Sequence, residues 1–201
     1  MIKNIIFDMG GVLVGFDRDR CISAFQHIGA HKIAVYVDEF RTEDLFERIE
    51  RGDITQEEFC QEAREIVGLP LNSQQIVDAW NALLTPCTDE KKQKLLQLKQ
   101  HYRLFLLSNT NIMHWEYCRD KLIGSKEHPI TDYFEQCFLS YEMQCVKPHK
   151  DIFEQALLSA GLKAEETLFI DDSLVNLEGA ASLGIHTFHE TEGHRWIDLI
   201  Q

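Results

Sequence analysis

The sequence lacks two features that would point to a membrane or to nucleic acid. No hydrophobic run approaches the roughly 18 residues of a membrane-spanning helix. Positive charge is scarce, because 33 acidic side chains stand against 20 basic ones and the formal net charge is −13. This balance argues against nucleic acid or a membrane surface as a partner. An anionic substrate is compatible with it only where a local cation reverses the sign.

The chain also lacks a signal peptide, a CxxC pair and an internal repeat. Its first eight residues read as a short buried strand without a basic region or a cleavage site, so we expect a cytoplasmic protein. The six cysteines are scattered, which argues against a zinc cluster and predicts reduced, mostly buried thiols. The 201 residues suffice for one core domain with a smaller insert.

What the sequence does contain is an alternation of strands and helices. Strands are predicted at Asn4 to Met9, Arg103 to Ser108, Gln136 to Ser140, Thr167 to Asp171 and His186 to Phe188. Helical patterns follow at Asn111 to Leu122, Asp151 to Ala160 and Leu174 to Leu183, and a last short helix is expected within Thr191 to Gln201. Strands that alternate with helices predict an α/β fold with a parallel sheet and right-handed crossovers.

Residues 17–85 differ from the rest, because they carry helical patterns and no convincing strand. Thr55 to Glu58 forms a capping box, Ser73 is expected to cap the next helix, and an acidic helix is expected from Asp38 to Glu50. We therefore predict a four-helix insert over 17–85, and a core formed by 1–16 with 86–201. An insert at this point lies over the carboxyl ends of the strands, where open α/β sheets bind ligands.

Two polar segments follow predicted strands near the start and the middle of the core. Asp8 ends the first strand, and Gly10-Gly11 then lets the backbone turn sharply and approach a ligand. Ser108 and Asn109 end another strand and open a helix, where a hydroxyl and backbone N–H groups suit a phosphate oxygen. Taken singly, Asp8 could equally cap a turn, and Ser108 and Asn109 could be plain helix caps.

Two charged segments follow later in the core. Lys147 precedes a helix, and alone it would be read as a solvated charge. The adjacent carboxylates of Asp171 and Asp172 end a buried strand, where like charges are costly without a cation, and such a site suits Mg²⁺. Because Asp8, Ser108 and the acidic pair all end parallel strands, we expect them to meet in one crevice.

In this order, the four segments resemble the motifs of the haloacid dehalogenase superfamily of phosphohydrolases, in its helical-cap subclass. The first motif, Asp8 to Val12, is similar to that of a glucose-1-phosphatase-like group, and the segment Glu47 to Thr55 resembles that group's cap. The resemblance implies a Rossmann-like parallel sheet with a helical cap inserted after the first strand. It implies a phosphatase that acts on a small phosphorylated metabolite such as a sugar phosphate.

The resemblance also implies roles for individual residues. Asp8 would be the nucleophile and would pass through an aspartyl-phosphate, while Ser108 and the backbone of Asn109 hold the phosphoryl group. Lys147 would neutralise charge between Asp8 and the phosphate. These roles fit phosphoryl transfer, which demands positioning and charge neutralisation.

A magnesium site follows from the same resemblance. Its ligands would be Asp8, the backbone carbonyl of Gly10, and Asp172, with Asp171 as a further ligand or as a partner behind them. Asn176 would support this loop. A bound cation lets an anionic carboxylate approach an anionic phosphate.

Gly10 departs from the family pattern, in which most phosphatases carry a second aspartate there as general acid. General acid help is worth ~10²–10⁴-fold. A cap residue or an ordered water could replace it, with a leaving group such as that of a sugar 1-phosphate. Alternatives are a weakly active phosphate-binding or regulatory protein and a metal-independent haloacid dehalogenase, although Asp171-Asp172 tells against the latter. The sequence leaves open the substrate, the cap residues that contact it and the oligomeric state, and it is compatible with a monomer.

Overall fold

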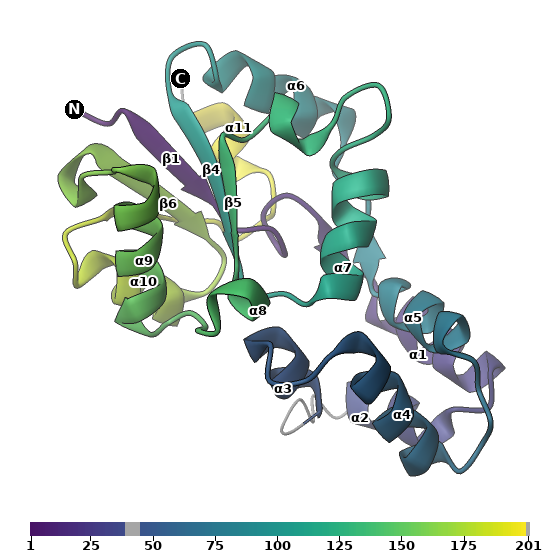
Figure 1. Ribbon diagram of the computed structural model, residues 1–201. Helices are drawn as coiled ribbons and strands as arrows, with labels where there is room; N and C mark the ends of the chain where they lie inside the picture. Colours follow the sequence, from purple (N-terminus) through teal and green to yellow (C-terminus); the bar gives the residue numbers. More distant parts are fainter. Residues whose placement is uncertain (39–44, 200–201) are drawn as a thin grey trace.

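The protein is built around a parallel sheet in the order β5-β4-β1-β6-β7. The structure is a computed structural model, and it describes residues 1–38 and 45–199 (Figure 1). The strands are β1 (Asn4–Phe7), β4 (Arg103–Ser108), β5 (Gln136–Leu139), β6 (Thr167–Asp171) and β7 (His186–His189). Every neighbouring pair is parallel. The predicted α/β class is thus confirmed, and each predicted strand is found within one or two residues of its ends.

Alternate residues of the central strands point to two separate hydrophobic layers. Ile5 and Phe7 belong to a layer that includes buried side chains of α6 (Asp89–Leu98) and α11 (Arg195–Leu199). Ile6 belongs to the opposite layer, with side chains of α9 (Lys150–Ala160) and α10 (Leu174–Ala181). Because both faces are covered, β1 is buried at every position, as expected of a central parallel strand.

The helical insert is the region between two short antiparallel strands, β2 (Gly15–Phe16) and β3 (Leu84–Thr85). Its described helices are α1 (Arg18–His27), α2 (His31–Asp38), α3 (Leu45–Arg51), α4 (Gln56–Val67) and α5 (Ser73–Asn81). They pack on a hydrophobic core of their own, which includes Phe25, Phe46, Phe59 and Trp80. The prediction of four helices was wrong, because the described part of the insert holds five.

Local capping explains where two of these helices begin. Thr55 and Glu58 form the predicted capping box, with reciprocal hydrogen bonds of 2.7 and 3.3 Å, and α4 ends at Gly68 in a left-handed conformation. The prediction for α5 was wrong by one residue. Asn72 is its cap and accepts a hydrogen bond from the backbone of Gln75, because the Ser73 hydroxyl is hydrogen-bonded to Glu57 instead.

The other helical predictions hold with adjusted ends. The helix after β4 is α7 (Ile112–Tyr117), which continues as a π-helical turn over Cys118–Leu122. The last helix, α11, lies inside the segment predicted for it, while 200–201 lie outside the described residues. Part of the predicted acidic helix, 39–44, also lies outside them. Elements that the sequence analysis did not predict are the short strands β2 and β3, of which β3 lies in the region expected to hold no strand, and also α6, α8 (Ser140–Met143) and the short 3₁₀ helices Ile130–Asp132 and Ala164–Glu166.

Two further findings concern composition. All six cysteines are free thiols, four of them buried and two half-buried. Within the part of the chain that the structure describes, no helix combines the length and the hydrophobicity that a bilayer crossing needs.

Candidate active site

Asp8 lies where β1 ends, at the carboxyl edge of the sheet. Its backbone N–H donates to the carbonyl of Ile170 at 2.8 Å, which continues the pairing of β1 with β6 for one more residue. Its Oδ1 accepts a hydrogen bond of 2.7 Å from the backbone N–H of Met9. The side chain is only 11% exposed, so its carboxylate is held in one orientation inside the molecule.

The glycine pair after Asp8 allows a second carboxylate to come close. Gly11 has φ +72°, and a Cβ at this position would overlap the side-chain oxygen Oδ2 of Asp172. Any other residue would therefore strain the turn and push Asp172 away. This gives a structural reason for Gly11 that the sequence analysis stated only in general terms.

Lys147 lies between two of the predicted acidic residues. Its ammonium Nζ is 2.8 Å from Oδ1 of Asp8 and 2.6 Å from Oδ2 of Asp171, and its side chain is 1% exposed. The structure thus brings together residues that are more than a hundred positions apart in the sequence. A lysine in this place is a fixed cation between two carboxylates and not a solvated surface charge.

Asn109 fixes the backbone of Lys147 with its side chain. Its Oδ1 accepts from the Lys147 N–H at 2.8 Å, and its Nδ2 donates to the Lys147 carbonyl at 2.9 Å. The sequence analysis assigned only the Asn109 backbone, to phosphate binding. The amide has a second task that was missed, because nothing in sequence spacing links positions 109 and 147.

Asp171 is the most fully hydrogen-bonded carboxylate of the cluster. Besides Lys147, it accepts hydrogen bonds from the amide of Asn176, at 3.1 and 3.2 Å, and from the backbone N–H of Ser173 at 2.8 Å. Its side chain is fully buried. Asn176 therefore lies against the acidic pair, as the sequence analysis expected of a supporting residue.

The cluster carries more negative charge than its single lysine balances. Burial raises the pKa of Asp8 to about 7, with Lys147 lowering it and Asp171 raising it. Burial and the neighbouring Asp171 also raise the pKa of Asp172. Burial lowers the pKa of Lys147, but Asp8 and Asp171 raise it by more, so the ammonium stays charged.

These carboxylates fit a hard divalent cation. One oxygen from each of Asp8, Asp171 and Asp172 lies within 4.8 Å of the others, and these are the residues that end β1 and β6. An all-oxygen donor set with excess negative charge suits Mg²⁺, which needs few protein ligands because it retains waters. The carbonyl of Gly10 and the division of roles between Asp171 and Asp172 stay predictions.

Ser108 ends β4 at the same edge as Asp8, since Leu106 of β4 pairs with Phe7 of β1. Its side chain is buried. Thr110, two residues after Ser108, is anchored by Ser140, because its backbone N–H donates to the Ser140 Oγ at 2.9 Å. Ser140 was missed by the sequence analysis, because it stands between a strand and a four-residue helix without any motif around it.

Phe16 covers the position of the missing general acid. A Cβ at Gly10 would overlap Cζ at the tip of the Phe16 ring, which belongs to β2 and is 56% exposed. An aromatic ring therefore occupies the space that a second carboxylate would need. No sequence pattern predicts this contact, because it depends on how the helical insert joins the core.

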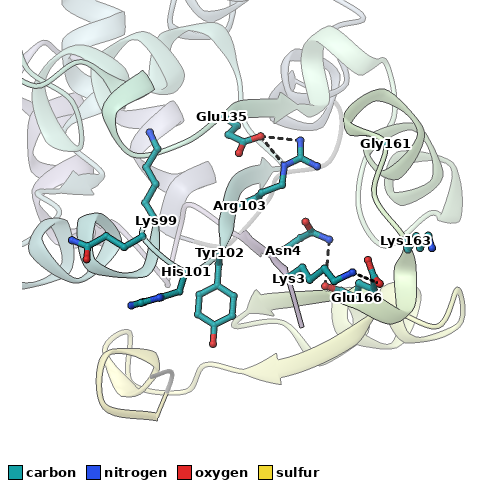
Figure 2. Close-up of a pocket in the computed structure, with 11 residues that line it drawn as sticks. Lys3, Asn4, Lys99, His101, Tyr102, Arg103, Glu135, Gly161, Lys163 and Glu166 are labelled. Carbon is teal, nitrogen blue, oxygen red and sulfur yellow. Dashed lines mark hydrogen bonds and ion pairs between the residues drawn. The ribbon is translucent and has the colours of Figure 1, made fainter. Parts of the chain in front are cut away.

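A hollow of about 560 Å³ lies at the opposite edge of the sheet, at the amino ends of the strands (Figure 2). Its wall contains two ion pairs, each neutral in itself: Lys3 with Glu166 at 2.7 Å, and Arg103 with Glu135 at 2.8 Å. Further cations contribute to the wall, including Lys99 and Lys163. Lys99 donates to the backbone carbonyls of Thr131 and Asp132. The two exposed ion pairs of this wall bring no carboxylates together around a buried cation, so they do not indicate a catalytic centre of the kind found at the carboxyl edge.

Comparison with known proteins supports the fold and the family. Residues 2–184 match the family described as haloacid dehalogenase-like hydrolase. The chain is 32% identical over 198 residues to D-ribitol-5-phosphate phosphatase of Bacteroides thetaiotaomicron, covering 98% of this chain and 95% of that protein.

Two solved structures resemble the molecule over its whole length. One is a HAD family enzyme of B. thetaiotaomicron in complex with magnesium and inorganic phosphate, with a TM-score of 0.94, 39% identity and full coverage of both chains. The other is a predicted HAD-like family hydrolase of Porphyromonas gingivalis, with a TM-score of 0.89, 36% identity, and coverage of 100% of this chain and 96% of that one. These matches confirm the family resemblance and the Rossmann-like fold, while the likeness to a glucose-1-phosphatase-like group stays a prediction.

Proposed function

The chain belongs to the haloacid dehalogenase-like hydrolase family, and from that premise we propose that it is a magnesium-dependent phosphatase that attacks small phosphate monoesters with Asp8. The observation that carries this proposal is the buried cluster in which Lys147 bridges Asp8 and Asp171, with Asp172 at its rim. A sugar or sugar-alcohol phosphate is the proposed substrate, in line with the activity named for the ribitol phosphate relative.

The nucleophile is prepared by the contacts of Asp8. The hydrogen bond from Met9 occupies Oδ1, as does the ion pair with Lys147. This leaves Oδ2 as the oxygen for in-line attack on phosphorus. The Ser108 hydroxyl and the Asn109 N–H bind phosphoryl oxygens beside it, and the Lys147 ammonium lowers the repulsion between carboxylate and phosphate.

Asp8, the Gly10 carbonyl and Asp172 would hold the magnesium ion. When bound, it supplies positive charge that neutralises the phosphoryl oxygens. Three protein donors, on Lys147, Ser173 and Asn176, share the roughly four lone-pair sites of the Asp171 carboxylate. Its first task is therefore to hold Lys147, and about one site remains for the ion.

The reaction then proceeds in two steps at phosphorus. In the first, an oxygen of Asp8 forms a bond to phosphorus while the bond to the leaving oxygen breaks, which gives an aspartyl-phosphate and an alcohol. In the second, a water oxygen attacks the same phosphorus and the Asp8 carboxylate leaves, which releases inorganic phosphate. The residues of the cluster stay in place throughout.

Residues 17–85 are the proposed cap of this enzyme, with 1–16 and 86–201 as its core. The helices of this region form a hydrophobic core of their own and join the main sheet at β2 and β3. A cap in this position selects the leaving group while the core holds the phosphate. A cytoplasmic location and a small phosphorylated metabolite as partner complete the proposal, with neither nucleic acid nor a membrane involved.

A dehalogenase and a phosphate-binding protein are the competing functions. Both fit the fold, but a metal-independent dehalogenase does not need three carboxylates whose oxygens converge within 4.8 Å. A phosphate-binding protein does not need a buried nucleophile next to a lysine.

The deciding measurement is phosphate release from a panel of sugar and sugar-alcohol phosphates. The assay is run first with about 5 mM Mg²⁺ and then after EDTA has removed the ion. We expect release that depends on the ion and returns when Mg²⁺ is restored. Halide release from 2-haloacids in EDTA would establish the dehalogenase instead. Phosphate binding without release from any ester would overturn the phosphatase.

A further inference from the structure

The core lacks an acid at Gly10, and the helical insert brings the end of α3 against the carboxyl edge of the sheet. We propose that Glu50, in the last turn of α3, donates the proton to the leaving oxygen in place of the acid absent at Gly10. This inference rests on the proposed phosphatase function and names the catalytic residue that the function still requires.

The backbone of Glu50 is fixed to the edge of the sheet that carries the site. The Oγ of Ser140 lies 2.6 Å from the carbonyl oxygen of Glu50, and 3.0 Å from that of Thr110. Ser140 is fully buried. The same hydroxyl thus connects α3 to the loop that follows Ser108 and Asn109.

A glycine keeps this contact close. Gly52 has φ +75°, and a Cβ there would overlap the backbone carbonyl of Tyr141 in α8. The end of α3 therefore lies directly against α8, which follows β5 at the carboxyl edge of the sheet (Figure 1). Glu50 is held over the core by two backbone contacts and does not depend on a flexible loop.

The side chain of Glu50 lies within electrostatic reach of the cluster. It is half-buried, and the charges of Asp8 and Lys147 both act on its carboxyl group. Among the described residues, none forms a hydrogen bond or an ion pair with that carboxyl group. It is a carboxyl group near the nucleophile that has no structural partner to hold it.

The other charged groups around α3 are engaged elsewhere. Glu47, one turn earlier, pairs with Arg51 at 3.7 Å, and Arg48 pairs with Glu62 of α4 at 2.9 Å. In α8, the Tyr141 hydroxyl donates to Glu142 at 3.1 Å. Of the charged groups named on these packed elements, only the Glu50 carboxyl group is both within electrostatic reach of Asp8 and without a partner in the described structure.

Its environment also favours the protonated form. Burial, together with the smaller effects of the charges of Glu47 and Asp8, raises the pKa of Glu50 to about 7 against the lowering effect of Lys147. A glutamic acid with an ordinary pKa would be almost fully ionised at neutral pH. At neutral pH, a large fraction of the molecules instead carry a protonated Glu50, as a general acid requires.

The proton balance closes over the two steps. Glu50 gives its proton to the leaving oxygen as the ester O–P bond breaks, and the product leaves as a neutral alcohol. The Glu50 carboxylate then accepts a proton from the water that attacks the aspartyl-phosphate. The acyl O–P bond breaks, Asp8 regains its carboxylate, and Glu50 is again protonated.

The test compares two substrates in the full-length, magnesium-loaded Glu50→Gln variant. An alkyl phosphate, glycerol 1-phosphate, has a poor leaving group, while 4-nitrophenyl phosphate has a good one that needs little protonation. We expect kcat for the alkyl ester to fall by ~10²-fold or more and kcat for the aryl ester to fall far less. Glu62→Gln, on α4 of the same insert, is the matched control and should leave both rates unchanged, because Glu62 pairs with Arg48 and does not act on Glu50.

The pH profile gives a second readout. For the alkyl ester, the wild-type rate should fall as pH rises above about 7, because Glu50 loses its proton there. This fall should disappear in Glu50→Gln, and Glu50→Asp, which keeps a shorter acid, should recover part of the rate.

Equal loss for both esters, or no loss for either, would overturn the proposal, since a structural role would not distinguish leaving groups. Failure of the phosphatase function itself would look different. The wild type would then release no phosphate from the aryl ester in the presence of Mg²⁺.

Discussion

The two edges of the same parallel sheet treat charge in opposite ways. At the carboxyl ends of the strands, Lys147 and Asp171 have side chains that are 1% and 0% exposed, and carboxylates outnumber cations. At the amino ends, Arg103 and Glu135 are 45% and 41% exposed and form a balanced pair (Figure 2). Both edges end the same strands, so the difference does not follow from the fold.

The comparison shows which edge the chain uses for chemistry. An exposed pair is screened by solvent and contributes about 0–1 kcal/mol. A buried cluster with excess negative charge costs stability unless a ligand compensates it. Such a cluster persists where function needs it, because natural sequences trade some stability for an active site. The excess of buried negative charge at the carboxyl edge therefore marks the site more clearly than the hollow at the amino edge does.

The largest effect should come from removing the nucleophile at the carboxyl edge. Asp8→Asn keeps the size of the side chain but not its attacking oxygen, so turnover should fall on the order of 10⁶-fold, as when other covalent nucleophiles are removed. Phosphate binding should partly persist, because Ser108 and Lys147 remain. Steady-state phosphate release and calorimetric titration with inorganic phosphate measure the two effects.

Asp120→Asn is the control for Asp8→Asn, since Asp120 is an exposed carboxylate paired with Arg119. It should leave turnover unchanged. Hydrolysis that survives in Asp8→Asn would remove Asp8 from its role and would leave the buried cluster without a chemical purpose.

The sequence predicted the carboxyl edge because its residues end predicted strands. Asp8, Ser108 and Asp171 each close a buried apolar run, and parallel strands bring such ends together. The fold class and the pairing of strand ends follow from this local signal. The contacts between positions 109 and 147 do not, since no local pattern links two loops from different strands.

The contribution of the helical insert was also beyond sequence reasoning. Phe16 over Gly10 and Glu50 beside Ser140 depend on the direction in which the insert leaves β2 and returns at β3. Periodicity gives the buried face of a helix but not the part of the core that its end meets. The sequence therefore indicated that an acid was missing without indicating what stands near it.

The next effect comes from adding a carboxylate to the catalytic edge. Gly10→Asp restores the usual acid and keeps the backbone carbonyl, and Phe16 can turn away because its ring is 56% exposed. Since Glu50 already supplies a proton, we expect a gain in kcat/KM on the order of 10-fold for alkyl phosphates, at the low end of general acid catalysis, and a smaller gain for aryl phosphates. In the Glu50→Gln background, the gain for alkyl phosphates should be larger.

Gly10→Asn is the matched control for Gly10→Asp, because it has the same bulk against Phe16 and no acidic proton. Kinetics with the two ester classes distinguish the variants. Equal gains for alkyl and aryl esters, or a gain with Asn as well, would show that moving Phe16 and not proton donation is responsible.

The smallest effect should come from the amino edge, at the pair of Arg103 and Glu135. Arg103 also lies 5.0 Å from the centre of the Phe105 ring and donates to the Ala160 carbonyl at 3.4 Å, so Arg103→Gln alone removes more than the ion pair. A double-mutant cycle with Glu135→Gln isolates the ion pair, and we expect a coupling of about 0–1 kcal/mol in the free energy of unfolding from urea titrations. This coupling should shrink as salt is added, and kcat should stay at the wild-type value in every variant. A large, salt-independent coupling would mean that the charges at the amino edge are not screened by solvent. A loss of turnover would mean that they take part in catalysis.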